Sequence, residues 1–414
     1  MKILVLNSGS SSQKSSLYEI ADRLPDVPPA PIWEGRIEWE GEQAKLQIKS
    51  RQTASEKFSV ASSHAEATKQ LLRHLLDGSS PVLRDKSDVA VAGHRIVNGG
   101  TLFQQPSVVT PEVESAIERM AAFAPLHNRA ELEGMEIVST MFGVVPQVAV
   151  FDTGFHAHLP QAAAVYPGPY EWFEKGIRRF GFHGINHEYC AQRTAQLLRA
   201  NLNSLKIVTC HLGNGCSLAA IRDGRSVDTT MGFTPLDGLM MGTRSGSVDP
   251  GILTYLMRES SLTGEQLDEL LNKKSGLLGI SGISGDMRQI VSAMKEGNTR
   301  AKLAFEIFVH RLTAGIASMA AALNGLDALV FTAGIGENSP EVRAAVCSQL
   351  TFLSLVLDSA KNTEAHSDQD IAAPESKVRV LVVRAQEDWA IARECWKLQS
   401  RPIAASSNEK FETD

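Results

Sequence analysis

The sequence lacks an excess of positive charge. Lysine and arginine number 41 against 47 aspartate and glutamate residues, which gives a formal net charge of −6. A nucleic-acid binder normally carries a basic stripe, so this balance argues against a nucleic-acid partner. It does not exclude local clusters of basic side chains in a cleft.

Long apolar runs are also lacking. The stretch from Leu312 to Gly336 comes nearest to the ~20 apolar residues that cross a bilayer, but Asn324 and Asp327 interrupt it. At the N-terminus, MKILVLN holds an apolar run of only four residues before polar residues follow. This is not the pattern of a signal peptide. We therefore expect a soluble, cytoplasmic protein with no membrane partner.

Cysteine is scarce and its spacing is uninformative. The five cysteines are odd in number, and no two form a C-x-x-C. Their spacing matches no zinc site, and reduced thiols in a cytosolic protein explain it best. The length of 414 residues, with 43% hydrophobic and 21% charged content, predicts two or three domains with enough chain for a full core.

A loop of small residues that ends in a lysine, VLNSGSSSQK (5–14), follows the first apolar run. It suits phosphate binding, but it lacks the second glycine before the lysine that a Walker-type loop has. The segment SSLYEI then alternates in polarity, and the prolines that follow leave no room for a helix of normal length. The pattern therefore predicts a strand–turn–strand phosphate loop.

The same unit occurs twice. KILVLNSGSS, from Lys2, aligns without a gap with KIVTCHLGNG, from Lys206, so that Gly9 matches Gly213. Each copy is followed by a short strand-like segment, SSLYEI or CSLAAI. This repeat predicts two related halves.

Other strands and helices have clear signals at their ends. The segment DALVFT reads as a buried strand, AGIGEN as a glycine loop, and Ser339-Pro340-Glu341 as the start of a helix. A glycine loop between a strand and a helix is a ready nucleotide site. Thr263 and Gln266 form a capping box before a helix, and a long helical pattern from about Thr299 ends at Asn324-Gly325. VRVLVV and AQEDWAIARECWKL predict a last strand and a last helix.

Four segments combine glycine with charged or imidazole side chains: GHRIVNGG (93–100), FDTGFH (151–156), RRFGFHGINH (178–187) and GFTPLDGLMMGTRSGSVDPG (232–251). Glycine lets the backbone approach a ligand, and arginine and histidine supply donors to anionic oxygens. Singly, Arg95, Asp152, His183 or Arg244 would more often be structural. Their joint occurrence with three glycine loops favours a site for phosphate chemistry.

On these segments the chain resembles the acetate kinase family, in the superfamily of acetate and sugar kinases, heat-shock ATPases and actin. The resemblance runs from Lys2 to about Lys397. It rests on ten ordered strings: NSGSSS, GHRIVNGG, APLHN, FDTGFH, GFHGINHEY, HLGNG, SVDTTMGFTPLDGLMMGTRSG, SGLLGISG, DMR and GIGENS.

The resemblance implies an α/β, two-domain actin-like ATPase fold. Each domain would have a βββαβαβα core of the ribonuclease-H-like type, with the active site in the interdomain cleft. The expected N-terminal domain is 1–151 plus 387–414, and the expected nucleotide- and substrate-binding domain is 152–386. The family also forms homodimers.

The family's functional residues carry over by position. Catalytic roles fall on Asp152, His183 and Arg244. Substrate binding falls on Arg95 and on an apolar methyl pocket of Val97, Leu126, Phe182 and Pro235. Magnesium, or manganese in its place, would be held by Asn7 and Glu387. Nucleotide binding falls on Lys14, His211, Leu212, Gly213, Asn214, Gly215, Asp286, Met287, Arg288, Gly334, Ile335, Gly336, Glu337 and Asn338.

The implied reaction is the reversible phosphorylation of acetate by ATP, which gives acetyl phosphate and ADP. Acetate and the γ-phosphate are both anions, so cationic side chains and Mg²⁺ must offset their repulsion. Carboxyl pKa values lie near ~4, so acetate is already ionised at pH 7 and needs no general base. We therefore expect an electrostatic or orienting role for Asp152.

Several positions depart from the family pattern: Gln13 and Ser15 beside Lys14, Asn98 in place of a histidine, Ser247 in place of an aspartate, Ala333 in place of a glycine, and Gln386 before Glu387. None removes a charged catalytic group. They bear on acyl-chain preference and rate rather than on reaction type.

Two rivals remain open. A propionate or other short-chain acyl kinase would use the same residues, with Val97 as the position to watch. A catalytically silent nucleotide-binding protein of the actin or chaperone kind would explain the glycine loops but not the two arginines and His183. Some relatives use pyrophosphate as donor, but the intact DMR and GIGEN segments favour an adenine nucleotide.

Overall fold

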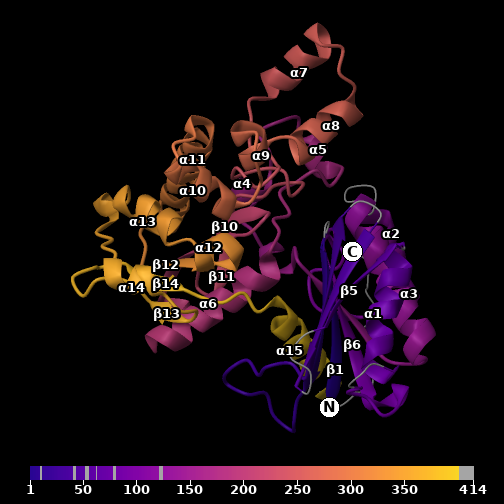
Figure 1. The fold of residues 1–414 in the computed structure, drawn as a ribbon. Coiled ribbons are helices and arrows are strands. Elements are labelled where there is room, and N and C mark those ends of the chain that lie inside the picture. Colours follow the sequence, from indigo (N-terminus) through magenta and orange to yellow (C-terminus); the bar gives the residue numbers. More distant parts are fainter. Residues whose placement is uncertain are drawn as a thin grey trace, which may run out of the picture. The chain divides into compact units, whose positions relative to one another are not determined.

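The computed structural model describes residues 1–9, 12–40, 43–51, 56–61, 63–77, 81–120 and 125–400 of the chain. These residues form two sheets with helices and divide into two compact units (Figure 1). Unit 1 comprises Met1–Phe151 and Glu387–Asp414, and unit 2 comprises Asp152–Gln386.

Unit 1 is built on an eight-stranded sheet in its described part, in the order β5-β4-β3-β2-β1-β6-β8-β7. Strands β1 to β5 pair antiparallel in sequence order, whereas β1, β6 and β8 run parallel. Its elements are β1 (Lys2–Ser8), β2 (Ser12–Glu19), β3 (Trp33–Glu40), β4 (Gln43–Ser50), β5 (Glu56–Ala61), α1 (His64–Asp77), the 3-10 helix η1 (Lys86–Asp88), β6 (Val89–Ile96), β7 (Ser107–Val108), α2 (Pro111–Met120), α3 (Pro125–Phe142), β8 (Gln147–Phe151) and α15 (Glu387–Ser400).

Unit 2 is built on a six-stranded sheet in the order β11-β10-β9-β12-β14-β13. Its strands are β9 (Lys206–Leu212), β10 (Cys216–Arg222), β11 (Arg225–Thr229), β12 (Ala328–Thr332), β13 (Gln369–Asp370) and β14 (Arg379–Val382). Its helices are η2 (Gly154–His156), α4 (Gln161–Ala164), α5 (Glu171–Glu174), α6 (Gly184–Leu198), η3 (Leu202–Ser204), α7 (Pro250–Glu259), α8 (Gly264–Lys273), α9 (Gly276–Ser281), α10 (Met287–Lys295), α11 (Thr299–Leu323), α12 (Ala333–Asn338), α13 (Pro340–Ser348), η4 (Thr351–Leu353) and α14 (Ser359–Thr363).

The two sheets share one plan. In each, three sequential strands pair antiparallel and two later strands add in parallel beside the first: β3-β2-β1-β6-β8 in unit 1 and β11-β10-β9-β12-β14 in unit 2. The first strands, β1 and β9, are the segments that the sequence repeat aligned. The prediction of two related halves is therefore confirmed, and the chain has the two-domain actin-like fold.

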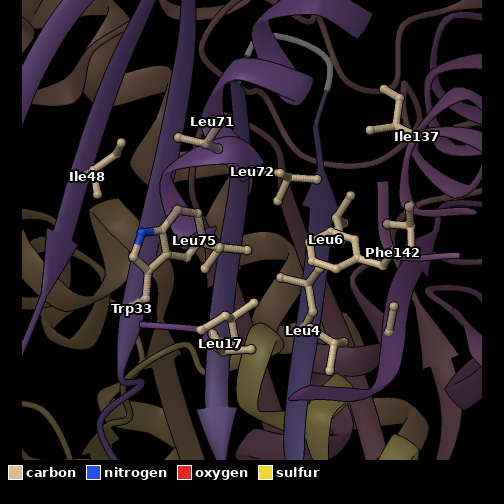
Figure 2. Packing of buried hydrophobic residues seen from close by; sticks show 14 of the residues in the cluster. Leu4, Leu6, Leu17, Trp33, Ile48, Leu71, Leu72, Leu75, Ile137 and Phe142 are labelled. Carbon is tan, nitrogen blue, oxygen red and sulfur yellow. The ribbon is translucent and has the colours of Figure 1, made fainter. Parts of the chain in front are cut away.

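Helices cover both faces of the unit 1 sheet. Leu4 and Leu6 of β1 pack with Leu71 and Leu72 of α1 in one buried cluster (Figure 2). Side chains alternate between the two faces of a strand, so the neighbours of these leucines face the other way. On that side α15 packs closely, because a Cβ on Gly93 of β6 would lie 2.5 Å from Cys395 Sγ. Burial on both faces explains why β1 is continuously apolar from Ile3 to Leu6.

The unit 2 sheet also lies between helices. Ser217 of β10 hydrogen-bonds His187 of α6, whereas its neighbour Leu218 faces Gly315 of α11. Two helices therefore cover opposite faces. Among the described helices, α11 is long and apolar enough to cross a membrane by length and composition alone. It spans Thr299–Leu323 and so begins before the stretch from Leu312 to Gly336 that the sequence pointed to. Its contacts with β9, β10 and β11 are those of a core helix.

Most of the punctuated elements form as expected. Thr263 and Gln266 make both hydrogen bonds of the capping box before α8, and Ser339 caps α13 with Pro340 in its first turn. Helix α11 ends at Asn324 in a left-handed conformation. The prediction of a glycine loop at AGIGEN is wrong, because residues 333–338 form the helix α12. The Glu337 carboxylate accepts the Ala333 N–H at 3.1 Å, which satisfies a donor that the first turn leaves open.

Candidate active site

The loop Gly213–Gly215 follows β9 and is closed on itself. The Gly213 N–H donates to the Gly215 carbonyl at 3.0 Å, and Gly242 N–H donates to the Asn214 carbonyl at 3.1 Å. The second bond ties this loop to the segment that carries Arg244. The phosphate loop predicted from HLGNG therefore lies beside a second predicted segment of the site.

Gly215 is the point at which the predicted catalytic side chains meet. A Cβ built on it would lie 3.4 Å from both Cε1 and Nε2 of His183, and 3.6 Å from Nη1 of Arg244. Arg244 is held there by a hydrogen bond from Nη1 to the Pro235 carbonyl at 3.1 Å. The absence of a side chain on Gly215 therefore leaves a space that an imidazole and a guanidinium both face.

Asp152 holds His183 in an uncommon backbone conformation. His183 precedes α6 with φ 57° and ψ 24°, in the left-handed region that side-chain-bearing residues seldom adopt. Its backbone N–H donates to Oδ2 of Asp152 at 2.8 Å, and Asp152 is fully buried. Asp152 and His183 both belong to unit 2, so this hydrogen bond fixes the His183 backbone within that unit. The structure thus brings together Asp152, His183, Arg244 and Pro235.

A second imidazole lies against His183. The rings of His183 and His211 stack with centroids 3.9 Å apart and planes 9° apart. The amide of Asn186 donates to Nδ1 of His211 at 2.9 Å, so a neutral His211 carries its proton on Nε2. That Nε2 lies on the side of Gly213, 3.6 Å from where a Cβ of the glycine would be. His211 therefore offers a donor at the phosphate loop.

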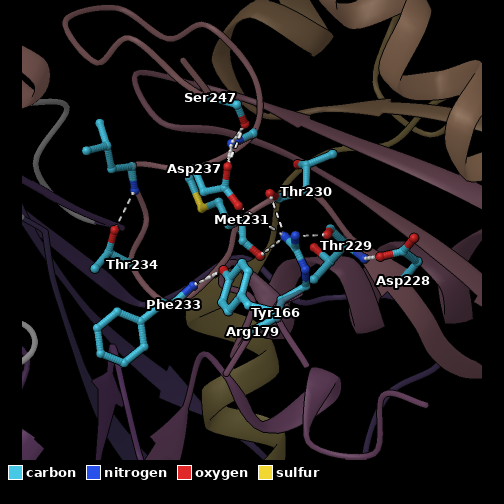
Figure 3. A network of polar contacts seen from close by, with 12 residues as sticks. Tyr166, Arg179, Asp228, Thr229, Thr230, Met231, Phe233, Thr234, Asp237 and Ser247 are labelled. Carbon is cyan, nitrogen blue, oxygen red and sulfur yellow. Dashed lines mark hydrogen bonds and ion pairs between the residues drawn. The ribbon is translucent and has the colours of Figure 1, made fainter. Parts of the chain in front are cut away.

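A polar network shapes the segment that carries Pro235 and Arg244 (Figure 3). Nη1 of Arg179 donates to three successive carbonyls, those of residues 229, 230 and 231, at 2.9–3.0 Å and lies 3.5 Å from Oδ2 of Asp237. Ser247 donates to Oδ1 of Asp237 at 2.5 Å. The serine that departs from the family pattern therefore serves as a donor to Asp237. Arg179 and Asp237 lie in two of the segments that the sequence singled out, but neither was assigned a role, because their contacts with each other and with residues 229–231 appear only in the folded chain.

The DMR segment begins helix α10. Asp286 is its N-cap and accepts the Arg288 N–H at 2.9 Å, and the Arg288 guanidinium pairs with the same carboxylate at 2.6 Å. Met287 is buried, whereas the side chain of Arg288 is 87% exposed. The carbonyl of Gly285 lies beside Gly242. This places the predicted DMR segment next to the loop that Asn214 contacts.

Helix α12 carries the GIGEN residues and packs against β9. Burial raises the pKa of the Glu337 carboxyl, whose Oε1 also accepts the Ala385 N–H at 2.9 Å. Asn338 donates to the Gly334 carbonyl at 2.9 Å. Arg343 is fully buried and donates to the carbonyls of Gly336 and Glu337, both at 2.8 Å. Ala333, where the family has glycine, has φ 65°.

In unit 1 the predicted metal ligands lie together. The amide nitrogen of Asn7 donates to Oε2 of Glu387 at 3.0 Å and to Oδ1 of Asp388 at 2.9 Å. Both bonds use the amide nitrogen of Asn7 as donor. Ser16 donates to the other oxygen of Asp388 at 2.7 Å. The sequence pointed to Glu387 but not to Asp388 as a partner of Asn7.

This donor set fits Mg²⁺. Carboxylate and amide oxygens suit the ion, which keeps several waters and takes the rest of its ligands from substrate phosphates. In the described part of the chain, no three His, Cys, Asp or Glu side chains are grouped as a metal site. Lys14 is exposed on β2 and lies opposite Asn7 in the strand register, on the same face of the sheet.

Two of the predicted acetate-binding residues of unit 1, Arg95 and Val97, lie at the end of β6. Arg95 donates from Nη1 to the Ser8 carbonyl at 3.2 Å, which places it beside the first phosphate loop. Val97 is buried, and its N–H donates to Glu131 at 3.0 Å. Asn98 accepts the Gly100 N–H at 2.8 Å and so stabilises a turn. The side chain of Leu126 lies outside the described residues.

Three further positions were singled out in the sequence. Phe182, one of two predicted pocket residues in unit 2, is 2% exposed and precedes His183. In unit 1, Gln13 and Ser15 flank Lys14 and depart from the family's apolar residues. Gln13 donates to Ser15 at 3.3 Å and accepts from Thr68 of α1 at 3.0 Å. The departures therefore form a buried polar cluster that satisfies itself.

Comparison with known proteins assigns the family. The model of the acetokinase family matches residues 2–393. Acetate kinases of Cyanothece sp. and Gloeobacter violaceus are each 56% identical over 401 residues, which cover 96% of this chain and 98% and 99% of theirs. The crystal structure of Porphyromonas gingivalis acetate kinase has a TM-score of 0.88 at 38% identity, over 96% of this chain and 100% of that one. A propionate kinase from Francisella tularensis has a TM-score of 0.86 at 36% identity, over 95% and 98%. The chain therefore belongs to the acetokinase family.

Proposed function

We propose that this chain transfers the γ-phosphoryl group of ATP to acetate, in a reversible reaction that needs Mg²⁺. Membership of the acetokinase family makes it a kinase with ATP as co-substrate and acetate as acceptor. The residue roles that follow are supported by the geometry within each unit. The single observation that carries them is the approach of His183 and Arg244 to Gly215 of the phosphate loop.

The positive charges of these residues offset the repulsion between the two anionic substrates. Two anions must approach each other, and fixed donors aimed at the developing charge lower the barrier most effectively. In unit 2 we assign Arg244 and His183 to the migrating phosphoryl group, and the loop from His211 to Gly215 to the nucleotide phosphates. In unit 1 we assign Arg95 to the acetate carboxylate and Lys14 to the phosphates. The methyl group of acetate requires apolar neighbours, which suits Val97, Leu126, Phe182 and Pro235.

Asp152 has a role that needs no proton transfer. Acetate is already ionised at pH 7, so a general base has nothing to remove. The Asp152 carboxylate instead holds the His183 backbone through Oδ2. Its negative charge also favours the cationic groups and the metal ion that phosphoryl transfer requires. We therefore assign Asp152 an orienting and electrostatic role.

Magnesium would be bound by Asn7 and Glu387, with Asp388 as the second carboxylate that fixes the Asn7 amide. When bound, the ion neutralises charge on the ATP phosphates. Met287 and Arg288, with Asp286 as helix cap, and the α12 residues from Gly334 to Asn338 are assigned to adenosine. Unit 2 would thus be the nucleotide- and substrate-binding domain, and unit 1 the domain of the first phosphate loop and the metal.

A preference for propionate is the second candidate, favoured by the similarity to a propionate kinase. One methylene changes binding by only about 1–3 kcal/mol, so both acids are expected to react to some degree. Val97 is the residue of the proposed pocket whose size would decide this preference.

We further propose a cytoplasmic homodimer without nucleic-acid or membrane partners. Helix α7 supports the dimer, because it is long enough to be amphipathic but buries none of its residues. Ile252 and Tyr255 lie on one face of α7 and are 49% and 55% exposed. Large apolar side chains that remain exposed together on a helix favour an interface with another chain.

Product formation tests the reaction directly. With ATP, Mg²⁺ and acetate, the protein should form acetyl phosphate, trapped as the hydroxamate, and ADP. Chelation by EDTA should abolish turnover, and added Mg²⁺ should restore it. We expect kcat/KM for acetate to exceed that for propionate by roughly 10- to 200-fold. A higher value for propionate would assign the chain to the second candidate. ATP binding with no acyl phosphate from acetate, propionate or butyrate would overturn the function.

Substitution of Asp152 separates its two roles. In Asp152→Asn the side-chain oxygen still accepts the His183 N–H, but the charge is lost. We expect kcat to fall roughly 100-fold, as for other fixed electrostatic groups, with the thermal unfolding midpoint retained. Asp152→Ala, which also loses the acceptor, should fall further. Near-native turnover and Mg²⁺ affinity in Asp152→Asn would contradict the electrostatic role.

The dimer is tested by sedimentation velocity. The protein should sediment at twice the chain mass of 44.9 kDa. Ile252→Asp/Tyr255→Asp should shift the protein toward monomer, because charges would be buried unpaired at the interface. Val144→Asp is the matched control, since Val144 is an exposed apolar residue outside α7. A monomeric wild-type protein, or a double variant that stays dimeric, would contradict this interface.

A further inference from the structure

Behind His183 lies a chain of hydrogen bonds that the proposed mechanism does not use. The Ser217 hydroxyl lies between two imidazoles, 2.9 Å from Nδ1 of His183 and 2.7 Å from Nε2 of His187. The chain continues from Nδ1 of His187 to the Thr209 hydroxyl at 2.7 Å. Ser217, His187 and Thr209 are all fully buried. These four groups form one buried relay that ends at the imidazole beside Gly215.

The relay is held by regular secondary structure. Thr209 is on β9 and Ser217 on the adjacent β10, which pairs antiparallel with it. His187 is in the first turn of α6, and His183 is the residue that precedes this helix. Strand pairing and helix packing therefore fix the distance between the two imidazoles, and the serine hydroxyl fills the gap between them.

The proton count of the relay allows two arrangements. Burial, with the neighbouring His156 and His211, lowers the pKa of His187 well below its usual value, so His187 is neutral and carries one N–H. A serine hydroxyl has a single proton to donate. If Ser217 donates to His183, then His187 must donate to Ser217 through Nε2. If Ser217 donates to His187, then His183 must carry a proton on Nδ1.

The two arrangements present different groups at Gly215. In the first, Nδ1 of His183 accepts, so a neutral His183 carries its proton on Nε2. In the second, a neutral His183 would turn a lone pair toward the loop. The Nε2 edge is the one that lies 3.4 Å from the Gly215 Cβ position, beside Arg244. Because phosphate and carboxylate oxygens are acceptors, only an Nε2–H is complementary to them.

We propose that Ser217, supported by His187, is a positioning residue that fixes the ring and the tautomer of His183, so that a neutral His183 presents an Nε2–H donor to the reacting oxygens. The proposal rests on the function assigned to His183 above. It allows His183 to act as a donor without becoming an imidazolium. Thr209 completes the relay by donating to Nδ1 of His187.

The tautomer is measured without any turnover. In protein labelled with ¹⁵N-histidine, long-range ¹H–¹⁵N correlation spectra distinguish a protonated ring nitrogen from one with a lone pair. The His183 signals are assigned by their loss in His183→Gln. At pH 7.5 we expect Nε2 protonated and Nδ1 unprotonated in the wild-type protein. An imidazolium, or a proton on Nδ1 alone, would overturn the proposal.

Three serine variants test the consequence for catalysis. Ser217→Ala should lower kcat roughly 10- to 100-fold, because a buried Nδ1 loses its partner, with a smaller change in KM for ATP. Its spectrum should show the proton of His183 shared between both nitrogens. Ser217→Thr keeps the hydroxyl and should restore the wild-type tautomer and most of kcat. These readouts would not move together if Ser217 only filled space.

Ser226→Ala is the matched control. Ser226 is also buried, and its hydroxyl lies 2.7 Å from Nδ1 of another buried histidine, His156. The Ser226→Ala variant should lose about as much unfolding free energy as Ser217→Ala, but it should keep the wild-type His183 spectrum and kcat. If Ser217→Ala keeps both kcat within twofold and the wild-type tautomer, or if Ser226→Ala lowers kcat as much, Ser217 has no positioning role. A wild-type protein with the expected tautomer but no acyl-phosphate formation would support the relay and overturn the proposed function instead.

Discussion

The hydrogen bond from the His183 backbone to Asp152 is the contact on which the rest of the site depends. It holds His183 in a left-handed conformation at the start of α6. That conformation lays the imidazole against His211 and turns one nitrogen to Ser217 and the other to the phosphate loop. A buried carboxylate thus sets the position of an imidazole at the start of a helix, and both residues belong to unit 2.

The duplicated sheet explains where the proposed phosphate-binding residues come from. In both units the first strand pairs antiparallel with the second. The register then places a polar pair on one face: Asn7 opposite Lys14 in the first copy, and His211 opposite Ser217 in the second. The same backbone arrangement therefore holds different functional groups. The first copy places an amide and an amine opposite each other, and the second places an imidazole opposite the Ser217 hydroxyl.

Much of the fold could be predicted from the sequence, because short local patterns indicate where its strands and helices begin and end. The repeat of Lys2 and Lys206 segments, the capping box and the helix end at Asn324 are short-range features, and they form as expected. The helical state of AGIGEN could not be predicted, since it depends on Glu337, a side chain read as part of a nucleotide loop. Strands β4 and β5 were not anticipated, although β4 alternates polar and apolar residues as a half-buried strand does.

The residues of the candidate site also fall into those that the sequence identified and those that it missed. Glycine loops and charged residues revealed Asp152, His183 and Arg244. Ser217, Asp388 and Arg343 were missed as partners in the site, because their importance comes from contacts with residues distant in sequence. Ser217 and Arg343 are buried residues in a strand and a helix, and nothing in the local pattern distinguishes them from structural positions. Only the folded chain shows which polar side chains form hydrogen bonds with the residues of the site.

The approach of His183 and Arg244 to Gly215 is tested most directly by kcat/KM of Gly215→Ala. A methyl group there would make ordinary van der Waals contacts at 3.4 Å and 3.6 Å, so the protein should fold with an unchanged unfolding midpoint. It would, however, occupy the space from which a reacting oxygen reaches both donors, and we predict a loss of roughly 100-fold or more. Gly264→Ala, at an open position in α8, should keep wild-type activity. A Gly215→Ala enzyme with near-native kcat/KM would contradict the account.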